Sequence, residues 1–388
     1  MIPWVFVAFT GVMGGLIYLH FYMAHVCWRR VRGQVTEDID PNYVRREDYF
    51  GQSFRTKLQT WRELPTVTLP DGSKTIQHGA EVIRLSPAIR RAGNLKSDDV
   101  LVIQGDFTSG PNSQLGREVH AEGNIDIGPS SQLQAIASDG NLTLGTDVAV
   151  TRWVDSWGDL HLSRGCVVHS RVTSRKSAFL ELNVQAQSVF AAEITTAPDP
   201  SRKSAPPPAS TQPRLQIPPP TGTDPAVLTN AGVDPKKLMP LGAACWIYRG
   251  SLRPLSAVHL TAQLVVRGEC VIPPASLLEH DLKSSGNLFI GSASECRGNL
   301  VSEANLSVGP DVRFAGMIHA DGEILLHHGA RGESPNGPLA VDAGSWLNVE
   351  QGVTVRGKLS SGERVRVIPA SVAQAWSEKH RPQEVNRK

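Results

Sequence analysis

The chain has 388 residues, of which 40% are hydrophobic and 20% are charged, a composition that excludes intrinsic disorder along its whole length. Its 39 Lys and Arg residues nearly balance 37 Asp and Glu residues, giving a formal net charge of +2. The chain lacks the overall positive charge of nucleic-acid binders, so we expect no nucleic-acid partner. The five cysteines are an odd number without a Cys-x-x-Cys pair, which argues against a disulfide framework or a zinc site.

Residues 1–28 are predicted to form a transmembrane anchor. The stretch 2–22 carries no formal charge, and a helix of that length rises about 30 Å, enough to cross the hydrocarbon core of a bilayer. Nothing basic precedes Trp4, as it would in a secretory signal peptide, so we expect no cleavage. Arg29, Arg30 and Arg32 follow the span directly, and such basic flanks stay in the cytoplasm. They are the predicted topology determinants of a single-pass protein whose bulk is cytoplasmic.

Residues 29–98 are predicted to be a juxtamembrane segment that contains a short amphipathic helix within 43–64. In that helix Phe50, Phe54, Leu58 and Trp61 fall on one stripe. Such a stripe either binds anionic lipid or a partner, or packs on the domain that follows. The packing interpretation is favoured.

An 18-residue repeat fills most of the remaining chain. The segment that starts at Gly105 resembles the one at Gly123, and the same start recurs along two blocks, residues 99–195 and 250–368. Twelve coils are visible, and they begin at Gly105, Gly123, Gly140, Gly158, Ala178, Gly250, Gly268, Gly286, Ala304, Gly322, Ser345 and Glu363.

Each repeat contains three short runs in which apolar and polar residues alternate, which is the pattern of strands with one buried face. Three strands per coil predict an all-β parallel β-helix, and Gly followed by Asn, Asp or Glu suits its corners. The predicted core positions of the repeat are Phe107, Ile125, Ile127, Leu142, Leu144, Leu160, Leu162, Leu288, Ile290, Leu306, Val308, Phe314, Ile324, Leu326, Leu347 and Val349.

A proline-rich insertion, residues 196–249, separates the two blocks and includes Pro206–Pro208 and Pro218–Pro220. It either links two separate β-helices or loops out of one continuous β-helix. The loop is favoured, because a solenoid tolerates insertions between coils and an interrupted stack exposes more strand edges. The polar tail, residues 369–388, is predicted to be disordered.

No sequence motif for catalysis, phosphate binding or metal binding is found, so no catalytic residue, cofactor, metal or small-molecule substrate is predicted. His327 and His328 are the most suggestive polar pair. Neighbouring residues of a strand point to opposite faces, so this pair is not expected to chelate one ion. The acidic residues keep no common position in the repeat, which argues against a carbohydrate-cleaving site.

The repeat resembles that of the bactofilins, bacterial cytoskeletal proteins, as in the segment from Leu306 to Gly322 with its Leu-x-Val-Gly, Val-x-Phe and Ile-x-Ala-x-Gly elements. The resemblance covers about residues 100–194 and 250–367. It implies a right-handed β-helix that assembles end to end without nucleotide and acts as a scaffold for envelope or cell-shape proteins. The anchor, the proline-rich insertion and the two blocks depart from the family pattern.

We therefore hypothesise a membrane-anchored structural scaffold at a bacterial inner membrane, with copies of itself, the membrane and envelope-synthesis or shape-determining proteins as partners. The alternatives are a β-helical carbohydrate-active enzyme and a hexapeptide-type acyltransferase. The acyltransferase requires an aliphatic residue and Gly every six residues, whereas only the first third of each coil shows them, as in Ile127-Gly128. The last coil, with Val365 and Val367, is the predicted interface with another subunit, because an uncapped β-helix end invites strand pairing.

Overall fold

The computed structural model describes residues 4, 13, 15, 18, 21, 22, 46–70, 72–90, 93–200, 214–220 and 233–380. It divides the chain into two units, Met1–Glu47 and Asp48–Lys388. Of the predicted anchor, only residues such as Trp4 and Tyr18 are described, and they are helical. No helix among the described residues is long and apolar enough to cross a membrane. Most of the predicted span, together with Arg29, Arg30 and Arg32, lies outside the described residues.

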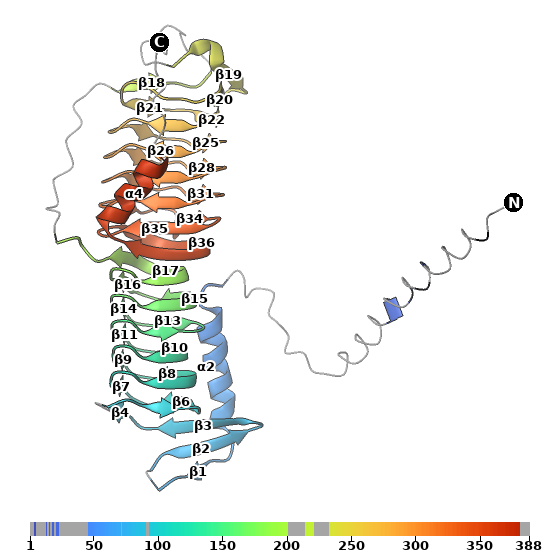
Figure 1. Ribbon diagram of the computed structural model, residues 1–388, viewed down its shortest axis with the longest axis vertical. Helices are drawn as coiled ribbons and strands as arrows, with labels where there is room; N and C mark the ends of the chain where they lie inside the picture. The colour runs from blue at the N-terminus through green and yellow to red at the C-terminus, as the bar shows by residue number, and fades with distance from the viewer. Residues whose placement is uncertain are drawn as a thin grey trace. The chain divides into compact units, whose positions relative to one another are not determined.

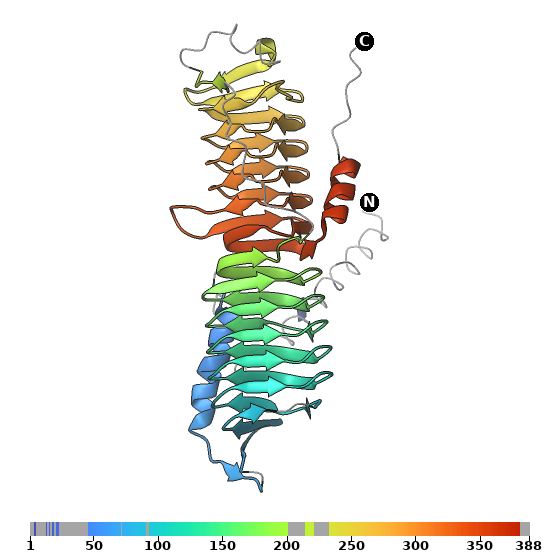
Figure 2. The same cartoon turned by 90° about the vertical axis from the view of Figure 1, so that its left-hand side faces the viewer.

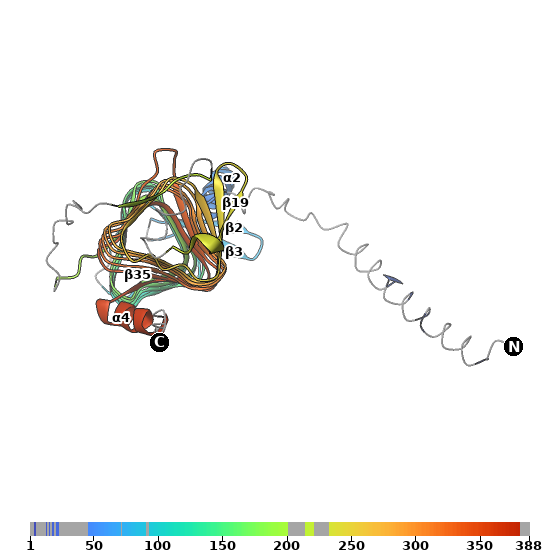
Figure 3. The same cartoon turned by 90° about the horizontal axis from the view of Figure 1, so that it is seen from above.

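The second unit is a β-solenoid of about 14 coils, whose outline is triangular when viewed along its axis (Figure 3). Its first stack consists of β1 (Val67–Thr68), β2 (Lys74–His78), β3 (Glu81–Ser86), β4 (Ile89–Arg90), β5 (Lys96–Ser97), β6 (Val100–Ile103), β7 (Phe107–Ser109), β8 (Gln114–Ala121), β9 (Ile125–Ile127), β10 (Gln132–Ser138), β11 (Leu142–Leu144), β12 (Ala149–Val150), β13 (Val154–Ser156), β14 (Leu160–Leu162), β15 (Val167–Ser174), β16 (Ser177–Leu180) and β17 (Gln185–Thr196).

Its second stack consists of β18 (Leu215–Ile217), the 3-10 turn η2 (Pro235–Lys237), β19 (Leu238–Leu241), β20 (Cys245–Arg249), β21 (Val258–Leu260), β22 (Gln263–Arg267), β23 (Cys270–Ile272), β24 (Leu277–Leu278), β25 (Leu282–Ser284), β26 (Leu288–Ile290), β27 (Glu295–Cys296), β28 (Leu300–Ser302), β29 (Leu306–Val308), β30 (Arg313–Phe314), β31 (Ile318–Ala320), β32 (Ile324–Leu326), β33 (Arg331–Gly332), β34 (Leu339–Ala343), β35 (Trp346–Glu350) and β36 (Thr354–Ile368).

Strands of successive coils pair in parallel and in register, as the repeat requires. Phe107 on β7 lies opposite Ile125 on β9, which lies opposite Leu142 on β11. Residues at the same place in the repeat therefore stack above one another inside the solenoid. All sixteen predicted core positions are at most 3% exposed and belong to one apolar core that runs through both stacks.

Left-handed backbone at one corner of the coil explains part of the repeat. In the first stack Asn112, Ser130, Asp147, Gly165 and Asn183 all have φ between 56° and 75°. Asn, Asp and Gly adopt this conformation at a lower cost than other residues, because their side chains are short or absent. The other corner is closed by side chains that bond to the next coil, such as Asn124 Oδ1, which accepts the backbone N–H of Asn141 at 2.9 Å.

The two stacks lie end to end, but the second stack runs in the opposite direction (Figure 1). The first stack ends with β17, and β17 pairs antiparallel with β36, the last strand of the second stack. Thus the last coils of both stacks meet in the middle, and their first coils form the outer ends. The apolar core runs through both stacks, but the favoured loop out of one continuous β-helix is wrong, because the coil before the insertion pairs with β36 and not with the coil that follows the insertion.

The solenoid is longer at its N-terminal side than the repeat suggested. The predicted boundary at residue 99 is wrong, because β3, β4 and β5 already pair in parallel with β6, β7 and β8 of the next coil. The predicted insertion 196–249 is also too long, because β18 pairs with β21 and β20 pairs with β22 of the second stack. Antiparallel hairpins, β1–β2–β3 and β19–β20, close the two outer ends.

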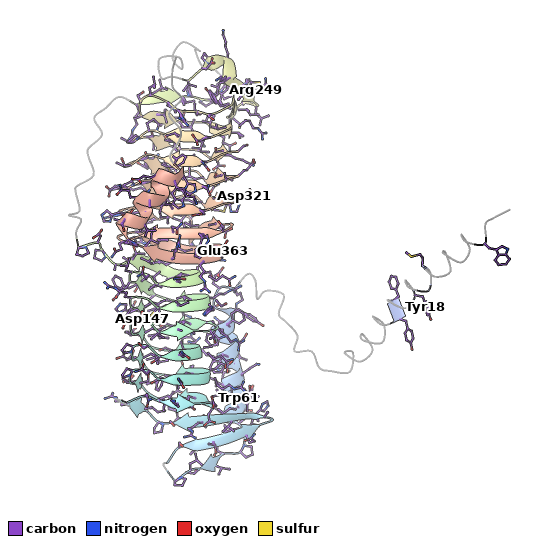
Figure 4. The ribbon with its side chains drawn as sticks, in the orientation of Figure 1. Tyr18, Trp61, Asp147, Arg249, Asp321 and Glu363 are labelled. Carbon is purple, nitrogen blue, oxygen red and sulfur yellow. The ribbon has the colours of Figure 1, made fainter. Side chains whose placement is uncertain are left out.

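One helix packs on the flank of each stack (Figure 2). Helix α2 (Tyr49–Arg62) buries Phe54, Leu58 and Trp61 against the first stack, which agrees with the favoured packing interpretation; Trp61 is labelled in Figure 4. Helix α4 (Ala370–His380) buries Ala373 and Trp376 against the second stack. The prediction that residues 369–388 are disordered is therefore wrong for 370–380, and the residues beyond lie outside the described chain.

Candidate functional site

The joint between the two stacks is the most extensive candidate site. Strands β17 and β36 are long because each bends around all three faces of its coil, so the pairing between them also covers three faces. The opposed residues include Ala186 and Val365 on one face, Val189 and Leu359 on the second, and Ile194 and Val355 on the third. All six side chains are at most 2% exposed. Each buried aliphatic side chain contributes about 1.5–3 kcal/mol, so the joint is a substantial apolar interface.

Polar contacts add to the backbone pairing of the joint, both in its buried part and at its exposed rim. Thr196 Oγ1 donates to the carbonyl of Glu350 at 3.0 Å and accepts the N–H of Val353 at 2.9 Å. Arg364 Nη2 donates to His169 Nδ1 at 3.0 Å, across the same joint. The joint therefore combines paired strand edges, an apolar centre and a polar rim. Specific protein interfaces have the same combination of contacts.

The predicted assembly residues lie in this joint. Val365 and Val367 are 2% and 1% exposed. The backbone N–H of Asn183 donates to the carbonyl of Val367 at 3.0 Å, and the N–H of Val367 donates to the carbonyl of Val184 at 3.0 Å. The two valines thus occupy an interface between two β-helix ends, but not the interface with another subunit that was predicted. The opposing end belongs to the same chain, so the last coil is closed rather than open as the sequence suggested.

A buried polar cluster lies between α2 and the first stack. Arg55 is 9% exposed, and its Nε donates to Asp139 Oδ1 at 2.6 Å while Nη1 pairs with Asp155 and Nη2 donates to the carbonyl of Ser138 at 2.9 Å. The guanidinium also lies 4.4 Å from the ring centroid of Trp157. One arginine on the helix therefore forms ion pairs with two carboxylates of the solenoid, and these contacts connect α2 to it.

His120, on β8 of the first stack, also belongs to this cluster. It is 3% exposed, and its Nε2 lies 3.2 Å from Asp139 Oδ1. Burial raises the pKa of Asp139, but the hydrogen bonds from His120 and Arg55 outweigh burial and hold this pKa below its usual value. A cleft of about 350 Å³ adjoins the cluster and is lined in part by Arg55, Leu58, His120, Asp139 and Trp157. Arg55 pairs with both carboxylates, so the cluster connects α2 to the solenoid.

A second polar cluster lies under α4 and includes one of the two suggestive histidines. His327 Nδ1 lies 3.0 Å from Glu350 Oε2, and His327 Nε2 lies 3.2 Å from Ser377 Oγ on α4. Trp376 Nε1 donates to Glu323 Oε2 at 2.6 Å. His328 turns away, and its Nδ1 lies 2.9 Å from the carbonyl oxygen of Gln351. The imidazole rings of the two neighbouring histidines thus have separate partners, although the backbone N–H of His328 also donates to Glu350 Oε2 at 3.1 Å. The described residues contain no group of three metal-ligating side chains.

Ser377, His327 and Glu350 follow the order of a serine, histidine and acid relay. Ser377 Oγ also donates to the carbonyl of Ala373 at 2.9 Å, one turn earlier in α4, so its hydroxyl proton is already used. A nucleophile of this kind also needs backbone N–H groups that bind the oxyanion, and N–H groups inside a helix are bonded to the preceding turn. The cluster therefore connects α4 to the solenoid and does not have the geometry for acyl transfer.

The two outer ends present short edge strands. Val67 on β1 is 67% exposed and Leu241 on β19 is 56% exposed. Pro65 and Pro70 flank β1, and Pro240 lies within β19. Proline and short length weaken an edge for further strand pairing. The outer ends are thus less prepared for strand addition than the coils that meet in the joint.

Comparisons with protein-family models, with curated proteins and with solved structures found no match. The resemblance to bactofilins therefore stays a prediction from the repeat.

Sequence reasoning missed the polar clusters under the two helices. Arg55 is 84 residues from Asp139 and 100 residues from Asp155, and only the docking of α2 brings the three together. His327 is 23 residues from Glu350, because the turn-rich insertion around Gly337 interrupts the 18-residue spacing. One available signal was Arg55, which lies beside the apolar stripe of the predicted helix.

Proposed function

We propose that this chain is a structural scaffold, without enzymatic activity, that self-assembles through β-helix ends and needs no nucleotide. The observation that supports this most is the joint. Two β-helix ends of this sequence pair through backbone hydrogen bonds on three faces, and such pairing requires only complementary strands. Rigid, repetitive flanks suit a scaffold, because a solenoid offers a long surface of regularly spaced side chains.

The proposal includes the finer features expected from the sequence. These are a right-handed coil, an anchor at residues 1–28 in a bacterial inner membrane, a cytoplasmic body and envelope-synthesis or shape-determining proteins as partners. Assembly beyond one chain would use the outer ends, at β1 and β19. Because both edges are short and flanked or interrupted by proline, we expect this assembly to be weak and to depend on concentration.

No contact among the described residues favours a carbohydrate-active enzyme or a hexapeptide-type acyltransferase. The one relay-like arrangement, Ser377 with His327 and Glu350, is used to hold α4. The scaffold therefore remains the single proposed function.

Sedimentation of residues 48–388 over a range of concentrations, without nucleotide, tests assembly. We expect species larger than a monomer, and we expect Val67→Lys together with Leu241→Lys to reduce them by placing charge on both edges. Thr143→Lys, on a flank strand, is the matched control and should assemble like the parent chain. A parent chain that stays monomeric at every concentration would contradict assembly through the outer ends.

The membrane part of the proposal needs a separate measurement. In intact cells, Asn386→Cys in the C-terminal tail should resist membrane-impermeant thiol reagents, and the full chain should fractionate with membranes. Ready labelling of this cysteine would contradict the cytoplasmic location of the body.

A further inference from the structure

The connection between the two stacks must span the whole second stack. It leaves the joint after Thr196, the end of β17, and enters the outer end at Leu215, the start of β18. On this face the strands β36, β33, β30, β27, β24, β21 and β18 lie side by side beyond β17. Seven strand-to-strand steps of about 4.8 Å separate the two points by about 34 Å.

The connection is long enough for this span. Residues 197–214 are 18 residues, and an extended chain of that length reaches at most about 60 Å. A connection of six residues would reach only about 20 Å. The length of this connection therefore decides whether the two stacks of one chain can meet at all.

Nothing in the joint itself requires that both stacks belong to one chain. Its contacts are backbone pairs, apolar side chains such as Val189 and Leu359, and rim pairs such as Arg364 with His169. A second copy of the chain presents the same surfaces. Separation of the stacks would expose the apolar ends of both. Each stack therefore needs a partner end, either from the same chain or from a second copy.

We propose that the joint also forms between copies, so that the first stack of one chain closes on the second stack of another. The partner copy then contributes β36 to the core of the first copy, and the product is a closed exchanged dimer or an open chain of exchanged copies. The proposal deepens the scaffold function and rests on it for its biological setting, because anchoring in one membrane would concentrate the copies.

The same physics sets when exchange occurs. Two ends that belong to one chain meet at an effective concentration on the order of millimolar, because a covalent connection holds them near each other. At micromolar concentration in solution the joint should therefore form within one chain. Exchange should dominate once the connection is too short to span about 34 Å.

Deletion of residues 201–212 tests this, because it leaves six residues between Thr196 and Leu215. The control replaces the same twelve residues by Gly and Ser, which keeps the length. Ser188 on β17 lies opposite Ser360 on β36, and opposed residues of antiparallel strands are within the Cα distance of a disulfide. One full-length copy carries Ser188→Cys, a differently tagged copy carries Ser360→Cys, and the two are co-expressed and oxidised.

We expect a disulfide-linked pair of the two copies in the deletion chain, and little or none in the control at micromolar concentration. Parent chains without the new cysteines measure the background from native thiols. Leu359→Asp in the deletion chain should abolish the cross-link, because it places a charge in the apolar centre of the joint.

The proposal is overturned if the deletion chain stays uncross-linked, whether it is folded or insoluble, since in either case the stacks fail to meet between copies. It is also overturned if the cross-link survives Leu359→Asp. Because the cross-link reports only on β17 and β36, it is independent of assembly at β1 and β19. Failure of assembly at the outer ends would therefore leave the cross-linking result unaffected. Failure of the cross-link would likewise not exclude assembly at the outer ends.

Discussion

Replacing Arg55 by Ala should release helix α2 from the first stack. The substitution removes the arginine that forms ion pairs with both Asp139 and Asp155, and Asp155 is only 3% exposed. Removal of one partner from a buried ion pair costs about 3–5 kcal/mol, because the other charge is left without compensation. Asp139 keeps its contact with His120, so we expect a loss near the lower end, about 3 kcal/mol.

Hydrogen exchange of the α2 amides in residues 48–388 measures this loss locally. A change of about 3 kcal/mol corresponds to exchange that is roughly a hundredfold faster or more. Thr60→Ala, on the exposed side of the same helix, is the control and should change the opening free energy by about 0.5 kcal/mol or less.

A double variant tests whether the unpaired carboxylate of Asp155 causes this loss. If the uncompensated carboxylate causes the loss, Arg55→Ala combined with Asp155→Asn should protect α2 better than Arg55→Ala alone. Exchange that is less than about tenfold faster in Arg55→Ala would refute the view that the ion pairs fix α2. A double variant that is no better protected than the single one would refute the role of the buried charge.

Three further predictions concern other parts of the solenoid. The pKa of Asp139 is lowered in the folded chain, so its stabilisation of α2 is complete above the ordinary Asp pKa of about 3.9 and is lost as the pH falls below that pKa. Hydrogen exchange of the α2 amides, measured at decreasing pH, should show reduced protection. Ala293 has φ of 55°, so Ala293→Gly should raise the free energy of unfolding by about 1 kcal/mol, and a loss in urea unfolding would contradict corner strain. Burial raises the pKa of Cys166 and of Cys296 to about 12, so a thiol reagent should label half-buried Cys245 first and those two only after unfolding.

The coil could be predicted from the sequence because its chemistry repeats. Ile125 and Ile127 are buried in the core while Asp126 between them is exposed, and the aligned strands Leu142–Leu144 and Leu160–Leu162 keep an apolar, polar, apolar order. Where a helix covers the outer face of a strand, the alternation of apolar and polar residues is lost. Val100–Ile103 is buried on both faces because α2 lies on it, so β6 shows no alternation, and the block was predicted to begin only at residue 99.

The direction of the second stack could not be predicted, because alternation along a strand is the same in both directions. Strand β36 reads as an ordinary coil of the repeat, and only its pairing with β17 distinguishes it. The helix α4 was missed for a related reason. Only Ala373 and Trp376 are buried in it, and two apolar contacts do not establish a helical period.

Because the first stack is synthesised before the second, its end at β17 is exposed until β36 has been made. Thr196 and Val353, which bond across the joint, are 157 residues apart in the chain. At roughly 5–20 residues per second, a ribosome needs about 8–30 s to make the part that covers β17. During that time the finished first stack carries an open strand edge and an exposed apolar end, so we expect nascent chains to need a chaperone or a neighbouring nascent chain to shield it.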